Sequence, residues 1–352
     1  MSDTKLAPGT ARPSPGQQAG INRWRRWAPL AVLMCGTFMI VLDFFVVNVA
    51  LPSIEASLHA RASAIEWVVA GYGLSFAVLL IAAGRLGDRF GRRRVFGAGL
   101  AVFVLASAAC GLSTSAWLLV GARVAQGVGG ALISPNVLSI MGVTYPGADR
   151  VRAITVYGMV MGVAAAGGQL IGGALIAANV FGLGWRAVFL VNVPVGLAAL
   201  GCARGLVPES RDGQAARLDL RGMLLVTAGL TALVLPLVEG TSLHWPAWTW
   251  ACLAASPAIL AAFAASQLRA ARRGGAPLLD LALFRRRALA AGLATQLAFW
   301  CGQAALFLVL ALYLQEGRGQ SPLPRPRGAF QPGSCPAPRL RCRGRSRSDG
   351  RR

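Results

Sequence analysis

Long uncharged apolar runs constrain this chain more than any other feature of its sequence. Residues 67–83 and 95–120 contain no charged side chain, and between them lies Gly84–Arg94, a cluster of glycines and charges reading GRLGDRFGRRR. A helix that crosses the hydrocarbon core of a bilayer needs about 20 mostly apolar residues. The pattern therefore predicts a membrane hairpin whose basic connection stays on the cytoplasmic side.

The same pattern continues along most of the chain. Nine apolar runs are long enough to span a bilayer, namely residues 27–51, 64–83, 95–113, 115–140, 152–178, 185–206, 220–239, 246–266 and 289–314. Only 14% of the residues are charged, whereas soluble domains carry roughly 25%. We therefore predict an all-α fold, a polytopic membrane helix bundle with about nine spans.

The positions of the basic residues indicate how the chain is oriented in the membrane and which partners it binds. The formal net charge of +22 would suit a nucleic-acid-binding protein, but the basic residues form short clusters between the apolar runs rather than one basic face. Every second connection is basic, and the others hold only two arginines, Arg61 and Arg186. The alternation predicts a multi-pass protein of the cell membrane with a cytoplasmic N-terminus and no nucleic-acid partner. The sequence contains no nucleotide loop, metal cluster or nucleophile constellation, so we expect neither an enzyme nor a cofactor.

The segment Gly84–Arg94 has a specific spacing of glycines and charges. Glycines let a chain turn tightly and let helix ends approach each other, and Asp88 can pair with the arginines or face the positive end of a neighbouring helix. The alternative is an ordinary basic loop. The segment resembles the signature loop between helices two and three of the major facilitator superfamily, which implies a conformational switch made of Gly84, Asp88, Arg89, Gly91, Arg92 and Arg93.

Asp43 is a lone carboxylate within an apolar run. A charge inside a bilayer costs several kcal/mol unless it is paired or hydrated, so we expect Asp43 to be functional as a group that takes up and releases a proton. The alternative is a position near the outer boundary where Asp43 faces water. The stretch Leu42–Pro52 is similar to the helix-one motif of the drug:proton antiporter branch with fourteen spans, and Asn48 is expected to add a hydrogen-bonding group.

Arg123 is the only arginine well inside a predicted span. Gln126 follows three positions later and therefore shares its helix face. The alternative is an arginine that extends towards a helix end and reaches water. The stretch Gly121–Pro135 is similar to the helix-four motif of the superfamily. That resemblance implies that Arg123 lies close to the carboxylate of helix one and is coupled to Asp43.

A third stretch, Gly158–Gly173, resembles the antiporter motif of helix five. Small residues on one helical stripe allow close contact with another helix, and plain helix packing is the alternative to a functional role. The family usually has proline where this chain has Gln169, so the usual kink is not predicted and Gln169 is expected to hydrogen-bond inside the cavity. The candidate residues of this motif are Gly158, Gly162, Gly168, Gln169, Gly172 and Gly173.

The resemblance covers residues 22–322 and implies a fold with two six-helix halves and a substrate site between them at the midplane. It implies proton-coupled efflux of drug-like or metabolite small molecules, as in multidrug efflux and antibiotic resistance. The proton gradient would supply the energy, and the partners would be the substrate, protons and the bilayer. The alternative is a non-transporting fragment or a membrane interaction partner. The cargo and the oligomeric state stay open.

The C-terminal segment Arg318–Arg352 breaks the pattern, because its ten arginines follow a span that ends outside. We expect a break in the reading frame after about residue 322, and the alternative is a genuine basic tail. The predicted parts are a disordered cytoplasmic N-terminus (1–22), the N-terminal six-helix half (23–206), a linker with an extra hairpin (207–268), an interfacial helix and the first helix of the second half (269–317), and the tail (318–352).

Overall fold

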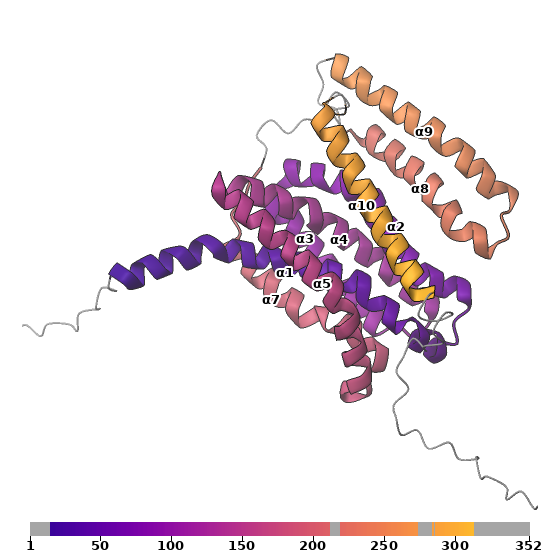
Figure 1. Cartoon of the computed structure of the whole chain (residues 1–352), viewed down its shortest axis with the longest axis horizontal. Helices are drawn as coiled ribbons and strands as arrows, with labels where there is room; N and C mark the ends of the chain where they lie inside the picture. The colour runs from indigo at the N-terminus through magenta and orange to yellow at the C-terminus, as the bar shows by residue number, and fades with distance from the viewer. Residues whose placement is uncertain (1–14, 212–218, 274–283, 285, 313–352) are drawn as a thin grey trace, which may run out of the picture. The chain divides into compact units, whose positions relative to one another are not determined.

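A computed structural model of the chain describes residues 15–211, 219–273, 284 and 286–312 (Figure 1). The long helices are α1 (Pro15–Leu58), α2 (Ala62–Phe90), α3 (Arg92–Gly111), α4 (Ala116–Thr144), α5 (Ala148–Ala178), α7 (Asn192–Leu206), α8 (Leu220–Ser242), α9 (Ala247–Arg272) and α10 (Arg287–Leu312). Each predicted apolar run coincides with a helical segment, and eight of these segments within the described residues are long and apolar enough to cross a membrane. The predicted all-α membrane bundle is confirmed.

The sixth span is built from several short pieces. It consists of η2 (Gly184–Arg186), α6 (Ala187–Leu190) and α7, and it follows a separate short turn, η1 (Val180–Gly182). Pro194 has no N–H group with which to bond the carbonyl of Leu190, so the helical ladder is interrupted between α6 and α7. The break places Asn192 at the start of α7, inside the bundle.

The N-terminal part of the chain differs from the prediction. Helix α1 begins at Pro15, so residues 15–22, expected to be disordered, are helical. Proline suits the first position of a helix because its missing N–H would have no partner there. Residues 1–14 and the tail 318–352 lie outside the described residues. So do residues 274–283, which hold all but the last residue of the interfacial helix expected at Pro277–Phe284. The domain boundaries therefore stay predictions.

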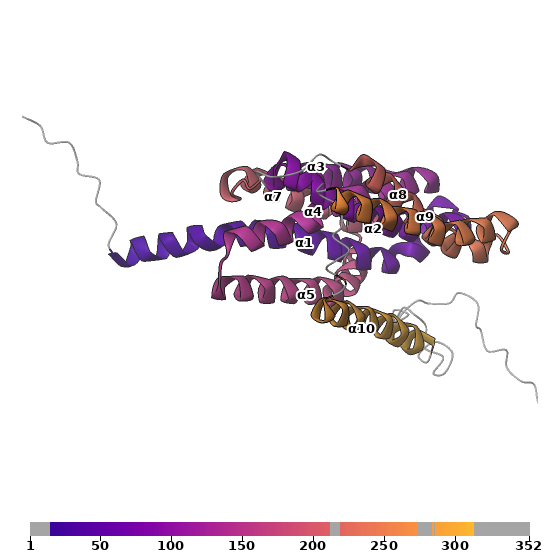
Figure 2. The same cartoon turned by 90° about the horizontal axis from the view of Figure 1, so that it is seen from above.

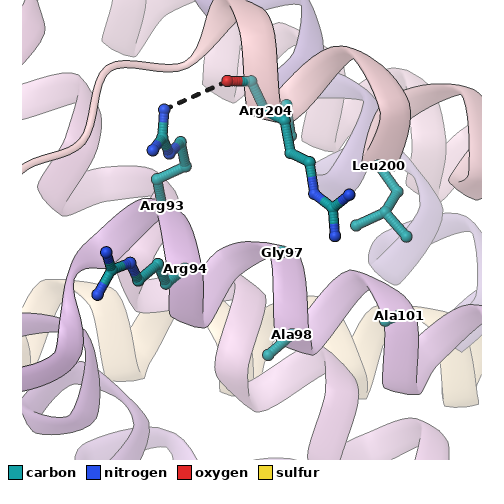
Figure 3. A pocket seen from close by; sticks show the side chains of 8 residues that line it. Arg93, Arg94, Gly97, Ala98, Ala101, Leu200 and Arg204 are labelled. Atoms are coloured by element: carbon teal, nitrogen blue, oxygen red, sulfur yellow. Dashed lines mark hydrogen bonds between the residues drawn. The ribbon is translucent and has the colours of Figure 1, made fainter.

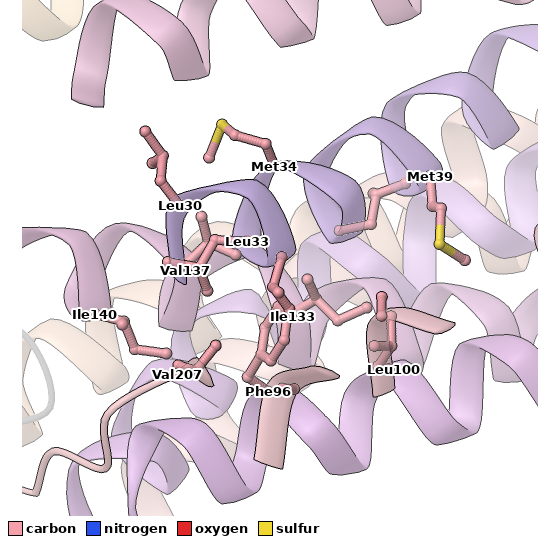
Figure 4. Packing of buried hydrophobic residues seen from close by; sticks show 14 of the residues in the cluster. Leu30, Leu33, Met34, Met39, Phe96, Leu100, Ile133, Val137, Ile140 and Val207 are labelled. Atoms are coloured by element: carbon pink, nitrogen blue, oxygen red, sulfur yellow. The ribbon is translucent and has the colours of Figure 1, made fainter. Parts of the chain in front are cut away.

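Residues 1–281 form one compact unit, and α10 belongs to a second unit that begins at Ala282. The core of the first unit lies where α1, α3 and α4 meet: Figure 4 shows Leu33 of α1, Phe96 of α3 and Ile133 of α4 in one buried cluster. Glycines bring α3 and α4 close together, because a Cβ added to Gly129 would lie 2.7 Å from the backbone nitrogen of Phe103. Small residues at such crossings allow the tight packing that holds membrane helices together.

Helix α1 is central to this unit. Figure 2 shows α5 on one side of α1 and α3 and α4 on the other. A second buried cluster, which includes Val46, Val47, Val68 and Phe189, packs around the later part of α1. Asp43, the polar side chain that α1 carries between these two clusters, is fully buried.

Helices α8 and α9 form an antiparallel hairpin within residues 207–273 (Figure 1). Asp219 accepts a hydrogen bond from the amide of Gly222 at the start of α8, and its other oxygen accepts one from Gln267 of α9 at 2.8 Å. Ser256 of α9 donates to the carbonyl of Gly229 at 2.9 Å. Helix α8 also contacts α2, where the Trp67 indole donates a hydrogen bond to Glu239. The hairpin is thus held both to itself and to the helices before it.

Candidate functional site

A cluster of polar side chains lies in the middle of the bundle and is cut off from solvent. We call it the Asp43 cluster. Its members come from four helices and are each at most 1% exposed: Asp43 of α1, Ser107 of α3, Arg123 and Gln126 of α4, and Asn192 of α7. Buried polar groups cost free energy unless they are hydrogen-bonded to one another. The cluster therefore depends on the geometry of its internal bonds.

The carboxylate of Asp43 is the acceptor around which this cluster is arranged. Arg123 forms an ion pair with its Oδ2 through Nη1. Its Oδ1 accepts hydrogen bonds from Gln126 at 2.8 Å and from Asn192 at 3.0 Å. The hydroxyl of Ser107 accepts from the same two amides, at 2.7 and 3.3 Å. Asp43 thus connects α1 to both α4 and α7 through one carboxylate.

Arg123 has further contacts that fix its guanidinium. Its Nη1 also donates to the Oε1 of Gln126 at 2.9 Å, and its Nε donates to the carbonyl of Val68 in α2 at 2.9 Å. The guanidinium carbon lies 4.3 Å from the ring centroid of Tyr72 and 5.8 Å from that of Phe189, within the range of cation–π attraction. Nη2 has no hydrogen-bond partner among the described residues. The two N–H donors on this nitrogen of the buried cation therefore remain available.

The arrangement can respond chemically to a proton. Truncating one partner of a buried ion pair typically costs about 3–5 kcal/mol, because the remaining charge is left without compensation. A proton on Asp43 would act in the same direction, since it removes the charge that offsets Arg123 and replaces one acceptor oxygen by a donor. Binding and release of a proton at Asp43 would therefore change how firmly α1 is held to α4.

Three of the predicted site residues are brought together. Asp43 and Arg123 are both fully buried and form the expected pair, and Gln126 bridges them. The alternatives of an Asp43 that faces water and an Arg123 that reaches water at a helix end are wrong for this structure, because both side chains are 0% exposed.

The structure places the other two candidates elsewhere. Asn48 is exposed and donates only within α1, to the carbonyls of Phe44 at 3.3 Å and Phe45 at 3.4 Å. Gln169 is exposed on α5, which runs as one unbroken helix, in keeping with the lack of a proline at that position. Neither residue joins the Asp43 cluster, because each is exposed whereas the cluster is buried.

Sequence reasoning missed Ser107 and Asn192. Each is a small polar residue within an otherwise apolar predicted span, and such residues hydrogen-bond across helices in membranes. Asn192 was the stronger signal, because an amide side chain with four hydrogen-bonding positions is rarely left unpaired in a bilayer. What the sequence could not show was that Asn192 donates to the Asp43 carboxylate and that Ser107 accepts from both Asn192 and Gln126.

The segment Gly84–Arg94 is not the loop that the sequence predicted. Helix α2 continues to Phe90 and α3 begins at Arg92, so the connection is the single residue Gly91. Its φ of 103° is accessible to glycine but strained for other residues. A Cβ at Gly91 would also lie 2.8 Å from the Oε1 of Glu209. The motif therefore builds a one-residue corner between two helices.

The charges of this corner form two groups. Asp88 accepts hydrogen bonds from Arg92 one turn later, at 2.8 and 3.0 Å, which is the first of the two pairings expected for it. Arg89 stacks on the ring of Phe90 at 5.6 Å. Arg93 lies with its Nε 3.6 Å from the carboxylate of Glu209, which sequence reasoning did not single out.

The segment that follows α7 is held against the corner. The Glu209 carboxylate accepts from the amide of Arg93 at 3.1 Å, and the carbonyl of Ser210 accepts from the amide of Arg92 at 2.9 Å. These bonds satisfy amide groups at the start of α3, which has no helical partners for them. The corner between α2 and α3 is thus capped by residues more than a hundred positions later.

Two glycines of α2 lie against α4. A Cβ at Gly84 would meet the Cβ of Pro135 at 3.6 Å, an ordinary contact. A Cβ at Gly87 would overlap the side-chain oxygen of Asn136, whose Nδ2 donates to the carbonyls of Leu132 at 2.7 Å and Ala83 at 3.4 Å. Gly87 is therefore required for the approach of α2 to α4, whereas Gly84 is not.

The glycines of α5 divide between two faces. Gly168 and Gly172 face α1, since a Cβ at either would lie 2.9 or 2.7 Å from side-chain atoms of Phe45 or Val46. Cβ atoms at the three other candidate glycines, Gly158, Gly162 and Gly173, would meet nothing within 4 Å in the part of the chain that the structure describes. The candidate glycines therefore do not share one packed face: Gly168 and Gly172 pack on α1 together with the buried face that includes Ala164, and the other three do not.

Comparisons with known proteins agree with this architecture. A family profile described as Major Facilitator Superfamily matches residues 33–334. The chain is 43% identical over 298 residues to the probable actinorhodin transporter of Streptomyces coelicolor, covering 85% of this chain and 52% of that protein. It is 38% identical over 305 residues to the tetracenomycin C resistance and export protein of Streptomyces glaucescens, covering 86% and 55%. The chain spans about half the length of these curated relatives.

Solved structures show the same fold. The crystal structure of PepTSo, a POT family transporter, has a TM-score of 0.50 with 14% sequence identity, covering 70% of this chain and 55% of that one. At this level of identity the likeness concerns the arrangement of the helices and not the substrate.

Proposed function

Because the chain belongs to the major facilitator superfamily, we propose that it acts in proton-coupled efflux of drug-like or metabolite small molecules by alternating access. The family and the curated relatives are transporters and not enzymes. Two relatives carry names that refer to the transport or export of antibiotics. An antibiotic-like small molecule is therefore the cargo class that we propose.

The observation that carries the proposal is the buried ion pair between Asp43 and Arg123. In the proposed mechanism, a proton on Asp43 removes the charge that holds Arg123 and so loosens α1 from α4. Arg123 then keeps its contacts with Val68 and Tyr72 and can turn its unpartnered Nη2 towards a substrate group. Loss of the proton restores the pair. The proton gradient is the only energy source in this scheme, and no cofactor takes part.

The proposed location is the cell membrane, with the N-terminus in the cytoplasm. The basic ends of α2, α3 and α7 support this orientation, because arginines gather on the cytoplasmic side of membrane proteins. Both ends of the corner at Gly91 would then face the cytoplasm. The bilayer, protons and a small-molecule substrate are the proposed partners, and nucleic acid is not among them.

The experiment is an efflux assay on the 352-residue chain. The chain is expressed in a host that lacks its own drug exporters, and the loss of a preloaded fluorescent dye is measured against an empty vector. We expect dye export that is abolished by an uncoupler and by Asp43→Asn. The control Thr155→Val, which changes an exposed hydroxyl bonded only within α5, should leave export unchanged. Export that persists unchanged in Asp43→Asn would refute the role of Asp43.

A second function is favoured by one observation. Cβ atoms added at Gly158, Gly162 and Gly173 of α5 would meet nothing within 4 Å among the described residues, although small residues of this kind suit a close helix contact. On this proposal the chain does not transport alone but binds another membrane protein through α5. Dye export by the chain alone, above the vector control, would refute it.

A further inference from the structure

A groove lies between α3 and α7, at the end of the bundle where the corner at Gly91 is found. Its volume is about 530 Å³. Figure 3 shows Leu200 and Arg204 of α7 facing Gly97 and Ala101 of α3, with Arg93 and Arg94 at the start of α3. The groove is hollow because α3 contributes only the small residues Gly97, Ala98 and Ala101 to its floor: a Cβ at Gly97 would still be 3.8 Å from Leu200.

The rim of the groove carries an excess of positive charge. Arg204 is exposed, and its guanidinium has no acidic partner among the described residues. Arg94 is 69% exposed, and its Nε lies 3.8 Å from the carboxylate of Glu209. Arg93 shares that same carboxylate at 3.6 Å. Three guanidinium groups are thus offset by one carboxylate, and Arg94 and Arg204 keep free donors for an anion.

The floor of the groove continues into an apolar outer surface. Leu105 follows Ala101 by one turn on α3 and is 71% exposed, and Leu197 precedes Leu200 on α7 and is 54% exposed. Residues spaced by three or four positions share a helix face, so these leucines extend the same seam away from the arginines. A cationic rim above an apolar seam matches a ligand with an anionic head and a hydrocarbon tail.

We propose that this groove binds an anionic phospholipid. The phosphodiester lies between Arg94 and Arg204, which can each donate two parallel hydrogen bonds to its oxygens. One acyl chain follows the seam over Gly97 and Ala101 towards Leu105. Basic pockets between membrane helices are suited to such head groups. The inference rests on insertion of the chain in a bilayer and does not depend on the transport proposed above.

Native mass spectrometry of the purified chain in mild detergent tests this proposal. The probes are phosphatidylglycerol, phosphatidylcholine with the same acyl chains, and inorganic phosphate. We expect phosphatidylglycerol to bind more tightly than phosphatidylcholine. The double variant Arg94→Gln/Arg204→Gln should weaken the binding of phosphatidylglycerol about 25-fold, since each basic residue near an anionic head group contributes about fivefold. The matched control is Arg221→Gln, an exposed arginine at the start of α8, which should leave binding unchanged.

A second variant tests the groove independently of charge. Gly97→Leu fills the floor against Leu200 while leaving every arginine in place. This variant should weaken the binding of phosphatidylglycerol at least tenfold. The helical content of the protein, measured by circular dichroism, should stay unchanged. Three results would overturn the proposal: equal affinity for the two lipids, unchanged binding in the double arginine variant, or inorganic phosphate that competes fully with the lipid. The last would identify a site for free phosphate. Because this experiment measures lipid binding, failure of the efflux assay would leave the lipid proposal standing.

Discussion

Replacing Asp43 by asparagine is the sharpest perturbation of the buried cluster. Asp43 accepts hydrogen bonds from Arg123, Gln126 and Asn192, and all four side chains are at most 1% exposed. Asparagine keeps the size of the side chain but has a single acceptor oxygen and two added donors. The variant therefore brings donors against donors and leaves the Arg123 cation without its counter-charge.

The expected cost follows from the isolation of Arg123. An uncompensated buried charge left by truncating an ion pair destabilises a fold by about 3–5 kcal/mol. Gln126 can recover part of this by turning its carboxamide so that the oxygen faces residue 43, but its present acceptor bond to Arg123 at 2.9 Å is then lost. We expect Asp43→Asn to lower the free energy of unfolding by about 3 kcal/mol, near the lower end of that range.

A double-mutant cycle separates the ion pair from general disruption of the core. Asp43→Asn, Arg123→Gln and the double variant are unfolded with sodium dodecyl sulfate and followed by tryptophan fluorescence. Since the double variant leaves no unpaired charge, its loss should be smaller than the sum of the single losses by about 2 kcal/mol. The control is Asn48→Ala on the same helix, whose amide bonds only within α1, and it should change stability by less than about 0.5 kcal/mol. Single losses that add to within about 0.5 kcal/mol would refute the coupling.

Three further predictions concern packing and the corner at Gly91. Gly87→Ala should lower the thermal unfolding midpoint, because its Cβ overlaps Asn136, whereas Gly84→Ala should leave the midpoint unchanged or raise it; equal effects would contradict the α2–α4 contact. Gly168→Leu should prevent α5 from packing on α1 and reduce the yield of monodisperse protein in size-exclusion chromatography, and Gly162→Leu should not; the reverse order would mean that the packed face of α5 is misplaced. Glu209→Gln should speed tryptic cleavage after Arg211, because it removes the carboxylate that holds this segment to Arg93. Unchanged cleavage relative to wild type would argue against that contact.

The positions of the helices were determined by the sequence alone. In a bilayer the backbone must satisfy its own hydrogen bonds, so an uncharged apolar run of about 20 residues has little choice but to be a helix. Lone charges within such runs were equally readable: Asp43 and Arg123 are each too costly to leave unpaired in a membrane, and the structure pairs them.

Only the tertiary structure decided which faces of those helices meet. In a membrane, the residues that face lipid are as apolar as those that face another helix, so composition carries little periodic signal for rotation about the helix axis. For this reason the sequence did not distinguish Gly168, which packs on α1, from Gly162, at which an added Cβ would meet nothing within 4 Å among the described residues.

Contacts between distant parts of the chain were also beyond the sequence. Asn192 joins Asp43 across 149 positions, and Glu209 reaches the amide of Arg93 across 116. Nothing in the local pattern around either residue specifies its partner, because an amide side chain can pair with any donor or acceptor, and a carboxylate with any donor, that packing brings within reach. The sequence determined where helices and costly charges lie, and helix packing decided which of those charges and amides share one buried site.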